Sequence, residues 1–257
     1  MMKAADKAAR RLRRDFGEVE NLQVSKKGPA DFVSNADIKA ESIIREELSY
    51  ARPDYGFLME ESGSHPGQDP QQRRWIVDPL DGTINFLHGL PHWAISIALE
   101  ERGELIAGLI YDPLKDETFT AEKGQGAYLN DRRIRISSQR DLAASLIATG
   151  VVRAGATNDY LAEVQAVLNE TSGIRRWGTA SLDLAYVAAG RYQGFWERGL
   201  SPWDIAAGIV IVREAGGLIS ETNGKPIGLN SSSILAANDS CHLALMKIFK
   251  KATASQG

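Results

Sequence analysis

The chain has 257 residues, 43% of them hydrophobic and 25% charged, so it is long enough to bury a full core without disulfides. A formal net charge of −3 argues against a general nucleic-acid-binding protein, which presents a basic face. Cys241 is the only cysteine, which excludes an intramolecular disulfide and a multi-cysteine metal site. No apolar run approaches the ~20 residues that span a bilayer, and the charged N-terminus is unlike a secretory signal. We therefore expect a cytoplasmic protein with no membrane partner.

The first half of the sequence predicts helices followed by a series of strands. The helices cover Lys3–Phe16 and Ala36–Tyr50, and a polar loop, Ser25–Asp31, lies between them. The predicted strands are Tyr55–Met59, Trp75–Val77, His92–Glu101, Leu105–Tyr111 and Glu117–Ala121. Gly103 and the pair Asp112-Pro113 mark turns between the last of these strands.

The second half alternates strands and helices, a pattern typical of a layered α/β unit. The predicted strands are Leu146–Thr149, Arg175–Trp177, Tyr192–Glu197, Leu218–Thr222 and Ile234–Ala236. The predicted helices are Tyr160–Thr171, Ala180–Ala189, Pro202–Ala215 and His242–Lys250. A soft boundary near Ser137–Asp141 carries no long linker. We expect one domain, residues 1–257, built of subdomains 1–138 and 139–257 that share one interface.

The motif with the clearest chemistry is Asp78-Pro79-Leu80-Asp81-Gly82-Thr83 after the hydrophobic strand. Pro79 favours a type I turn, which would bring Asp78 and Asp81 together at the edge of the sheet. Two close carboxylates repel each other unless a cation lies between them, and hard oxygen ligands suit Mg²⁺ or Mn²⁺. The N–H groups of Gly82 and Thr83, at the start of a short helical turn, could bind phosphate. The structural alternative is a solvated Asp-Pro turn with an Asp-Gly cap.

Other acidic residues lie where strands end or helices begin. Glu60-Glu61 follows a predicted strand, and Asp204 and Asp37 each lie in the first turn of a predicted helix. Each has a structural alternative, since paired glutamates are usually solvated and an acid near a helix N-terminus complements the helix dipole. Gathered with Asp78 and Asp81 around two or three metal ions, they would form a phosphoryl-transfer site.

These motifs resemble the inositol monophosphatase family, part of a superfamily that includes fructose-1,6-bisphosphatase. The matching segments are Glu60–Ser62, Trp75–His88 (WIVDPLDGTINFLH) and Trp203–Gly217 (WDIAAGIVIVREAGG). Lys27–Asp37 resembles the N-terminal loop of the family, and Gly178–Ala180 and Phe195–Glu197 resemble its substrate-side segments. The likeness runs over nearly the whole chain, and Leu182–Glu197 is most similar to the bacterial branch.

The resemblance implies a fold and a cofactor. The expected fold is an alternating α/β layered sandwich of the α/β (α+β) class, usually a homodimer. The expected cofactor is Mg²⁺, as two or three ions, with Mn²⁺ as a substitute and Li⁺ as an inhibitor. The expected activity is hydrolysis of a phosphate monoester, such as a polyol phosphate.

It also implies a role for individual residues. The first Mg²⁺ would be held by Glu60, Asp78 and the carbonyl group of Leu80, and the second by Asp78, Asp81 and Asp204. A loosely bound third ion would lie near Glu60. Thr83, hydrogen-bonded to Asp37, would help Glu60 to orient the attacking water. The N–H groups of Gly82 and Thr83 would hold the phosphate, and the hydroxyls of a sugar or cyclitol would face Asp81, Ala180, Glu197 and Asp204.

The sequence departs from the family pattern in places. Ile84 stands where many members carry a second threonine, although that position is not a ligand in the pattern. The N-terminal helix looks short, and the loop Val152–Asp159 looks compact, which concerns the interface and the rim of the cleft. The expected metal-binding positions are all present.

The substrate that we expect is myo-inositol monophosphate, hydrolysed by direct attack of a metal-activated water. Fructose 1,6-bisphosphate, a nucleotide 3′-phosphate and histidinol phosphate are alternatives for the same metal site. Glu197 favours inositol, because an acid there would accept hydrogen bonds from ring hydroxyls and repel an additional phosphate. Phosphatases of the haloacid dehalogenase type carry D-x-D-G-T with a nucleophilic aspartate, but the spacing here is one residue longer.

A non-enzymatic role is a further hypothesis. Some bacterial members of the family are thought to act with the transcription machinery, and the basic stretch Arg10–Arg14 could contact RNA polymerase or nucleic acid. The structural alternative is a solvated helix face.

Overall fold

The computed structural model describes residues 1–18, 24–28, 31–150 and 158–254. The helices are α1 (Met2–Phe16), α2 (Asn35–Ala51), α3 (Thr83–Leu87), α4 (Asn158–Glu170), α5 (Ala180–Ala188), α6 (Pro202–Glu214) and α7 (Asp239–Ala254). The strands of the first half are β1 (Val24–Gly28), β2 (Asp31–Ser34), β3 (Gly56–Met59), β4 (Gly63–His65), β5 (Arg73–Asp81), β6 (Ala94–Glu101), β7 (Glu104–Asp112), β8 (Glu117–Glu122), β9 (Gly126–Leu129) and β10 (Arg132–Ile134). Those of the second half are β11 (Leu146–Thr149), β12 (Gly173–Arg175), β13 (Gly194–Arg198), β14 (Leu218–Ser220) and β15 (Ser233–Ala237).

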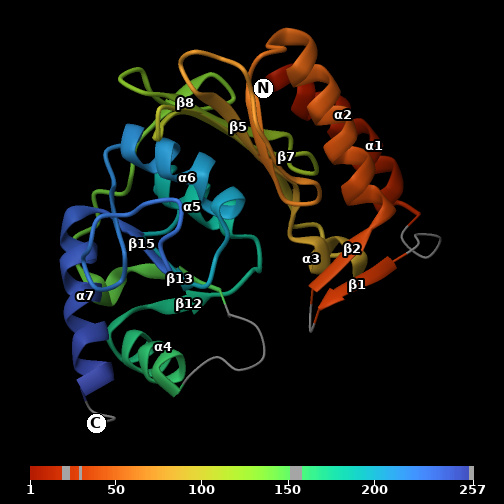
Figure 1. Cartoon of the computed structure of the whole chain (residues 1–257). Coiled ribbons are helices and arrows are strands. Elements are labelled where there is room, and N and C mark those ends of the chain that lie inside the picture. The colour runs from red at the N-terminus through yellow and green to blue at the C-terminus, as the bar shows by residue number, and fades with distance from the viewer. Residues whose placement is uncertain (19–23, 29–30, 151–157, 255–257) are drawn as a thin grey trace.

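Helix pairs and sheets alternate as layers (Figure 1). The pair α1 and α2 covers one face of the larger sheet, and α5 and α6 lie between that sheet and the smaller one. The pair α4 and α7 covers the far face of the smaller sheet. This arrangement confirms the expected alternating α/β layered sandwich.

The larger sheet has eight strands in the order β10-β9-β8-β7-β6-β5-β3-β4. Its neighbouring strands are antiparallel except for β3 and β5, which run parallel. Side chains alternate between its faces. Val77 and Ile97 therefore pack toward α1 and α2, whereas Ile76 and Ala98 pack toward α5 and α6.

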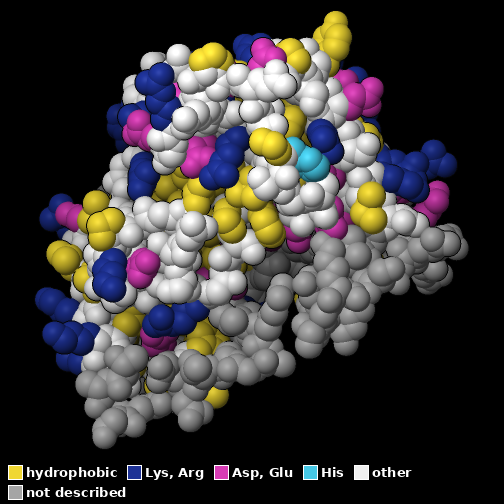
Figure 2. Space-filling model, in the orientation of Figure 1, with side chains coloured by type: hydrophobic (Ala, Val, Ile, Leu, Met, Phe, Trp, Pro, Cys, Tyr) yellow, Lys and Arg dark blue, Asp and Glu magenta, His cyan; other side chains and the backbone are white. Residues whose placement is uncertain are grey.

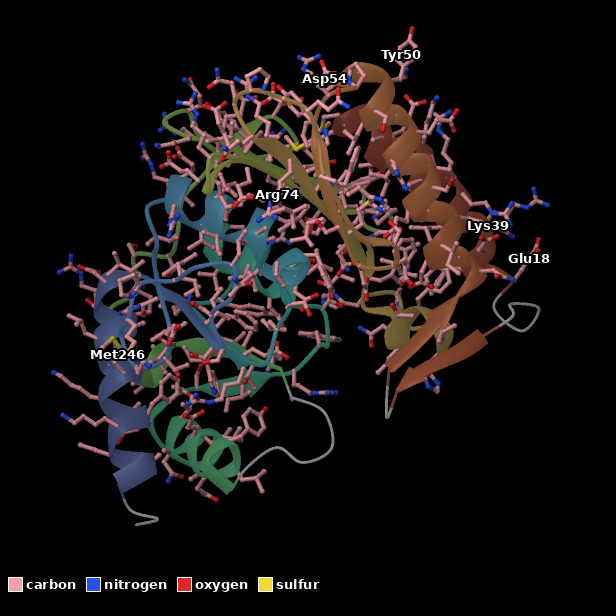
Figure 3. The ribbon with its side chains drawn as sticks, viewed as in Figure 1. Glu18, Lys39, Tyr50, Asp54, Arg74 and Met246 are labelled. Carbon is pink, nitrogen blue, oxygen red and sulfur yellow. The ribbon has the colours of Figure 1, made fainter. Side chains whose placement is uncertain are left out.

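The outer helices are amphipathic. On α2, Ile44 and Leu48 are buried against the sheet, whereas Tyr50 is 86% exposed and projects away from the body with Lys39 (Figure 3). Helix α6 differs, because every residue from Ile205 to Val212 is buried. A helix that is apolar on all sides belongs inside the core, and α6 accordingly contacts both sheets.

The smaller sheet has five strands in the order β12-β11-β13-β15-β14. Strand β11 runs parallel to β12 and β13, and β15 runs antiparallel to β13 and β14. In the sequence, the strands of the larger sheet all precede residues 137–141 and those of the smaller sheet all follow them, since β10 ends at Ile134 and β11 begins at Leu146. The division into subdomains 1–138 and 139–257 remains our proposal.

The structure corrects several local predictions. The polar loop expected at Ser25–Asp31 is wrong, because β1 and β2 form an antiparallel pair there. The predicted strand Arg175–Trp177 lies two residues earlier, as β12, and β6 begins two residues later than expected. Strands β4, β9 and β10 were not predicted, since they are short and lack a clear apolar alternation. The compact loop expected at Val152–Asp159 lies outside the described residues up to 157, and α4 begins at Asn158.

The exposed surface carries both signs of charge. On the face drawn in Figure 2, Lys and Arg side chains are scattered and interspersed with Asp and Glu, in keeping with the net charge of −3. In the described part of the chain, no helix is both long enough and apolar enough to cross a membrane.

Candidate active site

The acidic residues of the first half gather at the carboxyl ends of the parallel strands β3 and β5. Glu60 directly follows β3, and its N–H group donates to the carbonyl oxygen of Val77 (3.2 Å). Asp78 is the next residue on β5, so the paired strands bring the two acids to the same edge. Asp78 is 2% exposed, and its Oδ1 accepts a hydrogen bond from the N–H group of Leu80 (2.9 Å).

The turn predicted between Asp78 and Asp81 is wrong. Strand β5 continues to Asp81, and its pairing with β6 shifts register between the two residues. Asp78 pairs with Ser96 and Asp81 with Ala94, so β5 carries one more residue than β6 over this interval. An extra residue in one strand is a β-bulge, which commonly re-aims side chains beside functional sites.

Asp204 is brought to the same place by the start of α6. Its Oδ2 accepts a hydrogen bond from the N–H group of Ser201 (2.7 Å), which fixes the side chain at the helix N-terminus. The hydroxyl of Ser96, the β6 partner of Asp78, donates to the carbonyl oxygen of Trp203 (3.2 Å). The sheet and the helix are thus joined directly beside the two acids.

Burial and mutual repulsion change the acidity of this cluster. Burial raises the pKa of Asp78 well above its ordinary value, and the charges of Glu60, Asp81 and Asp204 raise it further. Burial also raises the pKa of Asp81 to about 6, although hydrogen bonds from Ser181 and the backbone of Ala180 oppose the shift. The nearby protein groups therefore do not fully compensate the negative charges that these carboxylates would carry when ionised.

The Thr83 hydroxyl lies at the junction of this site with α2. It is 3.0 Å from Asp37 Oδ1 and 3.0 Å from the carbonyl oxygen of Leu80, and its single proton can be donated to one of them at a time. Asp37 is fully buried. Gly82, just before Thr83, has a positive φ of 94°, and a Cβ there would press on the Thr179 hydroxyl. Glycine is therefore required at this turn from β5 into α3.

The residues expected on the substrate side come from α5 and β13. Asp81 Oδ2 accepts hydrogen bonds from the Ser181 N–H group (2.7 Å) and the Ser181 hydroxyl (2.5 Å), which anchors the start of α5 to β5. Ala180 is the first residue of α5. Burial raises the pKa of Glu197, on β13, to about 8, with the charges of Asp204 and Asp81 adding to the shift. The charges of Asp204 and Asp81 thus act on Glu197, which indicates that it lies near the cluster.

The donor set suits a hard cation, although the carboxylates are not closed around one. Among the described residues, no group of three or more His, Cys, Asp and Glu side chains is arranged as a formed metal site. Oxygen atoms of Asp78, Asp81 and Asp204 instead accept hydrogen bonds from nearby backbone N–H groups. All the donor atoms are nevertheless oxygens, which Mg²⁺ and Mn²⁺ prefer, and either cation would stabilise the ionised form of these buried carboxylates.

Sequence reasoning missed one buried acid behind the site, Asp183 on α5. It is 1% exposed, and neither carboxyl oxygen has a hydrogen-bond partner within the described ranges. Burial raises its pKa well above the ordinary value, and the charges of Glu197 and Asp81 raise it further. Its burial shows only in the structure, where every residue of α5 is buried.

Replacing Asp183 by asparagine should stabilise the metal-free protein relative to wild type, and this relative gain should grow as the pH rises. The folded pKa is raised, so stability is fully present below the ordinary aspartate pKa, about 4, and is lost as the pH rises toward the folded value. Asparagine does not ionise, and any cost of burying its amide is independent of pH. Melting temperatures of Asp183→Asn and wild type should diverge with increasing pH, and a constant difference would contradict the raised pKa.

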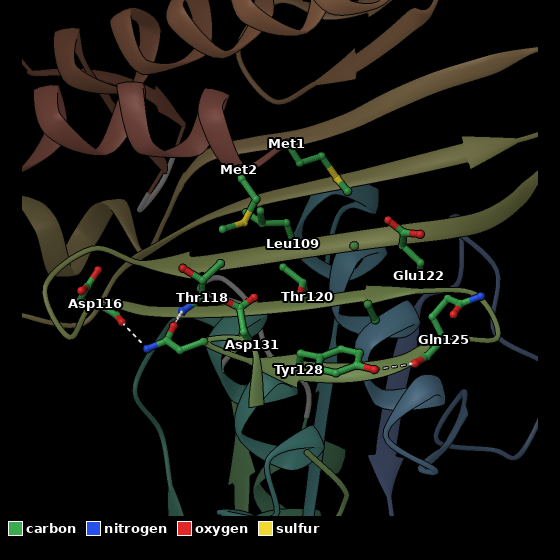
Figure 4. Close-up of a pocket in the computed structure, with 13 residues that line it drawn as sticks. Met1, Met2, Leu109, Asp116, Thr118, Thr120, Glu122, Gln125, Tyr128 and Asp131 are labelled. Atoms are coloured by element: carbon green, nitrogen blue, oxygen red, sulfur yellow. Dashed lines mark hydrogen bonds between the residues drawn. The ribbon is translucent and has the colours of Figure 1, made fainter. Parts of the chain in front are cut away.

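A separate cavity of about 700 Å³ lies away from these acids. It is bounded by Met1 and Met2 at the start of α1 and by Thr118, Thr120 and Tyr128 on the part of the larger sheet next to α1 (Figure 4). None of the proposed site residues lines it. Despite its size, the cavity is therefore not part of the site formed by the carboxylates.

Comparison with known proteins shows the family. The model of the inositol monophosphatase family matches residues 1–254, so the chain belongs to this family, whose activity is that of a phosphatase. It is 56% identical over 253 residues to an inositol-1-monophosphatase of Mesorhizobium japonicum, covering 98% of this chain and 95% of that protein. It is 42% identical over 250 residues to the Nus factor SuhB of Pseudomonas aeruginosa, covering 95% and 92% of the two chains.

The solved structures agree with the sequence comparison. The crystal structure of the extragenic suppressor protein SuhB from Bartonella henselae superposes with a TM-score of 0.95 at 56% identity. The match covers 98% of this chain and 97% of that one. The family resemblance and the fold expected from the sequence are therefore confirmed, whereas the individual residue roles remain proposals.

Proposed function

We propose that the protein is a Mg²⁺-dependent phosphomonoesterase that hydrolyses myo-inositol monophosphate to myo-inositol and phosphate. The observation that carries the proposal is the interaction of Asp78 with Glu60, Asp81 and Asp204, beside the turn where Thr83 is hydrogen-bonded to Asp37. Glu60 follows β3, Asp78 and Asp81 lie on β5, and Asp204 lies on α6, while Asp37 lies on α2. We also propose a cytoplasmic homodimer that Li⁺ inhibits.

The carboxylates would hold the metal ions. Glu60, Asp78 and the Leu80 carbonyl group would form one site, and Asp78, Asp81 and Asp204 the other, with a third ion near Glu60. When bound, Mg²⁺ lowers the pKa of water and offsets the charge of the phosphate. The raised pKa of Asp78 supports this assignment, because a cation would relieve the repulsion that causes it.

Thr83 and Asp37 would position the water that attacks phosphorus. When the Thr83 hydroxyl donates its proton to Asp37, its oxygen remains free to accept a hydrogen bond from a water molecule. Glu60 would orient the same water from the other side. The N–H groups of Gly82 and Thr83, at the start of α3, would hold the phosphate oxygens.

The polyol would lie on the side of Ala180 and Glu197. Carboxylates of Asp81, Asp204 and Glu197 can accept hydrogen bonds from ring hydroxyls, and the backbone of Ala180 lies beside Asp81. A relative of 56% identity bears the name inositol-1-monophosphatase, which supports a cyclitol over other polyols.

Replacing Glu197 by glutamine should raise KM for myo-inositol 1-phosphate more than it lowers kcat. The side chain would touch the leaving group and not the phosphorus. Above pH 8, where Glu197 is ionised, the loss should be about 1–3 kcal/mol, as for a hydrogen bond to a charged group. Steady-state kinetics on myo-inositol 1-phosphate and on p-nitrophenyl phosphate would measure it. An equal loss on the aryl phosphate, which has no polyol hydroxyls, would mean that Glu197 has another role.

The choice of substrate can be tested with a panel. Phosphate release would be measured from myo-inositol 1-phosphate, fructose 1,6-bisphosphate, adenosine 3′-phosphate and histidinol phosphate, with and without Mg²⁺. We expect the highest kcat/KM for the inositol phosphate. A higher kcat/KM for one of the other compounds would contradict the proposed substrate but not the proposed metal site.

A role in transcription is a second candidate, because a relative of 42% identity is named Nus factor SuhB. The basic stretch on α1 is largely engaged within the chain: Arg10 pairs with Asp6, Arg11 pairs with Asp15, and Arg13 donates to the carbonyl oxygen of Pro113. Arg14 is exposed. Capture of RNA polymerase by wild type and by Asp78→Asn would separate this role from catalysis, and capture by neither would remove it.

A further inference from the structure

The ends of β11 and β13 place Gly150 beside Glu197. The strands are parallel, with Ala148 opposite Phe195 and Thr149 opposite Trp196, so the next pair along the ladder is Gly150 and Glu197. Side chains alternate between the faces of a sheet. Phe195 packs on the α5 and α6 side. Gly150 and Glu197 therefore face that side as well, toward the acidic cluster.

The side chain of Glu197 lies across the backbone of Gly150. A Cβ atom at position 150 would overlap the carboxyl carbon of Glu197 and both of its oxygens. The backbone at Gly150 does not have a positive φ, so its conformation alone would accept any residue. What requires glycine here is the space that the Glu197 carboxyl group occupies.

The charged groups near Glu197 indicate where its carboxyl group lies relative to the acidic cluster. The charges of Asp204 and Asp81 act on it in one sense and that of Arg176 in the other, and the buried Asp183 on α5 also interacts with it. Trp196 and Arg198 point to the opposite face of β13, where Arg198 pairs with Glu163. A side chain at position 150 would overlap the carboxyl group and force it out of this position. Because Glu197 interacts with Asp204 and Asp81, we infer that the displaced carboxyl group moves toward the space for the polyol.

We propose that Gly150 is a positioning residue that fixes the Glu197 carboxyl group and thereby the width of the site on its polyol side. This inference rests on the proposed function. With glycine at position 150, the site accepts a ring polyol phosphate. With a larger residue, it narrows and favours substrates whose alcohol is small or makes no contact with Glu197.

The test compares Gly150→Ala with Gly228→Ala on three substrates. Gly228 is exposed, has no heavy atom within 4 Å of an added Cβ and has no positive φ, so it is a matched control. Gly150→Ala should lower kcat/KM for myo-inositol 1-phosphate about tenfold or more, mainly through KM. Glycerol 2-phosphate should lose less, and p-nitrophenyl phosphate should change by less than about twofold. Gly228→Ala should match wild type on all three.

A compensating variant separates positioning from general damage. Aspartate is one methylene shorter than glutamate, so Gly150→Ala combined with Glu197→Asp should relieve the overlap. The combined loss should be smaller than the product of the two single losses, because the residues are in contact. If Gly150→Ala alone does not fold, the double variant should. Additive losses in the folded variants, or a double variant that also fails to fold, would overturn the proposal.

A crystal structure of Gly150→Ala provides a readout that does not depend on activity. We expect the Glu197 carboxyl group displaced toward Asp204, with the backbone of β13 unchanged. An unmoved carboxyl group, or equal losses on all three substrates, would overturn this inference. Failure of the wild-type protein to release phosphate from any of them would instead overturn the proposed function.

Discussion

Replacing Asp78 by asparagine should abolish Mg²⁺-dependent turnover while the fold stays intact. The carboxylate is proposed to serve both metal ions, and losing one charged group that stabilises transition-state charge costs at least about 10²–10³-fold in kcat. Asparagine keeps the size of the side chain and can still accept the hydrogen bond from Leu80. Phosphate release at saturating Mg²⁺ and the far-ultraviolet circular dichroism of the variant would be measured together.

The same variant should be more stable than wild type when metal is absent. Burial and three neighbouring acids raise the pKa of Asp78, so stability is lost as the pH rises from the ordinary aspartate value toward the folded one. Asparagine removes that loss. Asp112→Asn is the control, since Asp112 is a fully buried acid that pairs with Lys115 outside the site. The Asp112→Asn control should lower the melting temperature and keep turnover. Turnover of Asp78→Asn within about tenfold of wild type would contradict the metal assignment.

Replacing Thr83 by alanine should lower kcat by about 10²–10⁴-fold with little change in KM. The hydroxyl is proposed to position the attacking water through its hydrogen bond to Asp37, and that bond contributes little to holding the substrate. Thr83→Ser keeps the hydroxyl and should retain much of the rate. Equal loss in the two variants would show that the methyl group of Thr83, and not its hydroxyl, is what matters.

The stereochemistry at phosphorus separates direct attack by water from a covalent mechanism. A single displacement inverts the configuration at phosphorus of a phosphorothioate substrate made chiral with oxygen isotopes, whereas an aspartyl phosphate on Asp78 would give net retention through two displacements. We expect inversion and no phosphoenzyme after acid quenching. Retention would contradict the roles of Thr83 and Asp37, even if inositol phosphate were the substrate.

Much of the layered fold follows from patterns that are local in the sequence. Amphipathic spacing predicted α2, and the apolar segment at Pro202–Ala215 predicted α6 within one residue. The hydrophobic runs of β6 and β7 lie deep in the core, so their apolar composition was enough to predict them as strands. The family motifs likewise rest on contiguous residues, which is why the resemblance could be stated before the fold was known.

What the sequence could not supply depends on contacts between distant segments. The bulge between Asp78 and Asp81 exists only against β6, so an isolated Asp-Pro segment was interpreted as a turn. Asp183 looks like an ordinary polar residue of a helix until α5 is seen buried on all sides. Gly150 has no local feature that marks it, because its role depends on a side chain 47 residues further along the chain.

The most direct test of the account is a Mg²⁺ titration of the metal-free protein with myo-inositol 1-phosphate as substrate. Metal would first be removed with a chelator, and released phosphate and myo-inositol would both be measured. We predict no turnover without metal, recovery on adding Mg²⁺, and equal amounts of the two products. Turnover that persists in the chelator, or none at any Mg²⁺ concentration, would contradict a metal-dependent phosphomonoesterase built on Glu60, Asp78, Asp81 and Asp204.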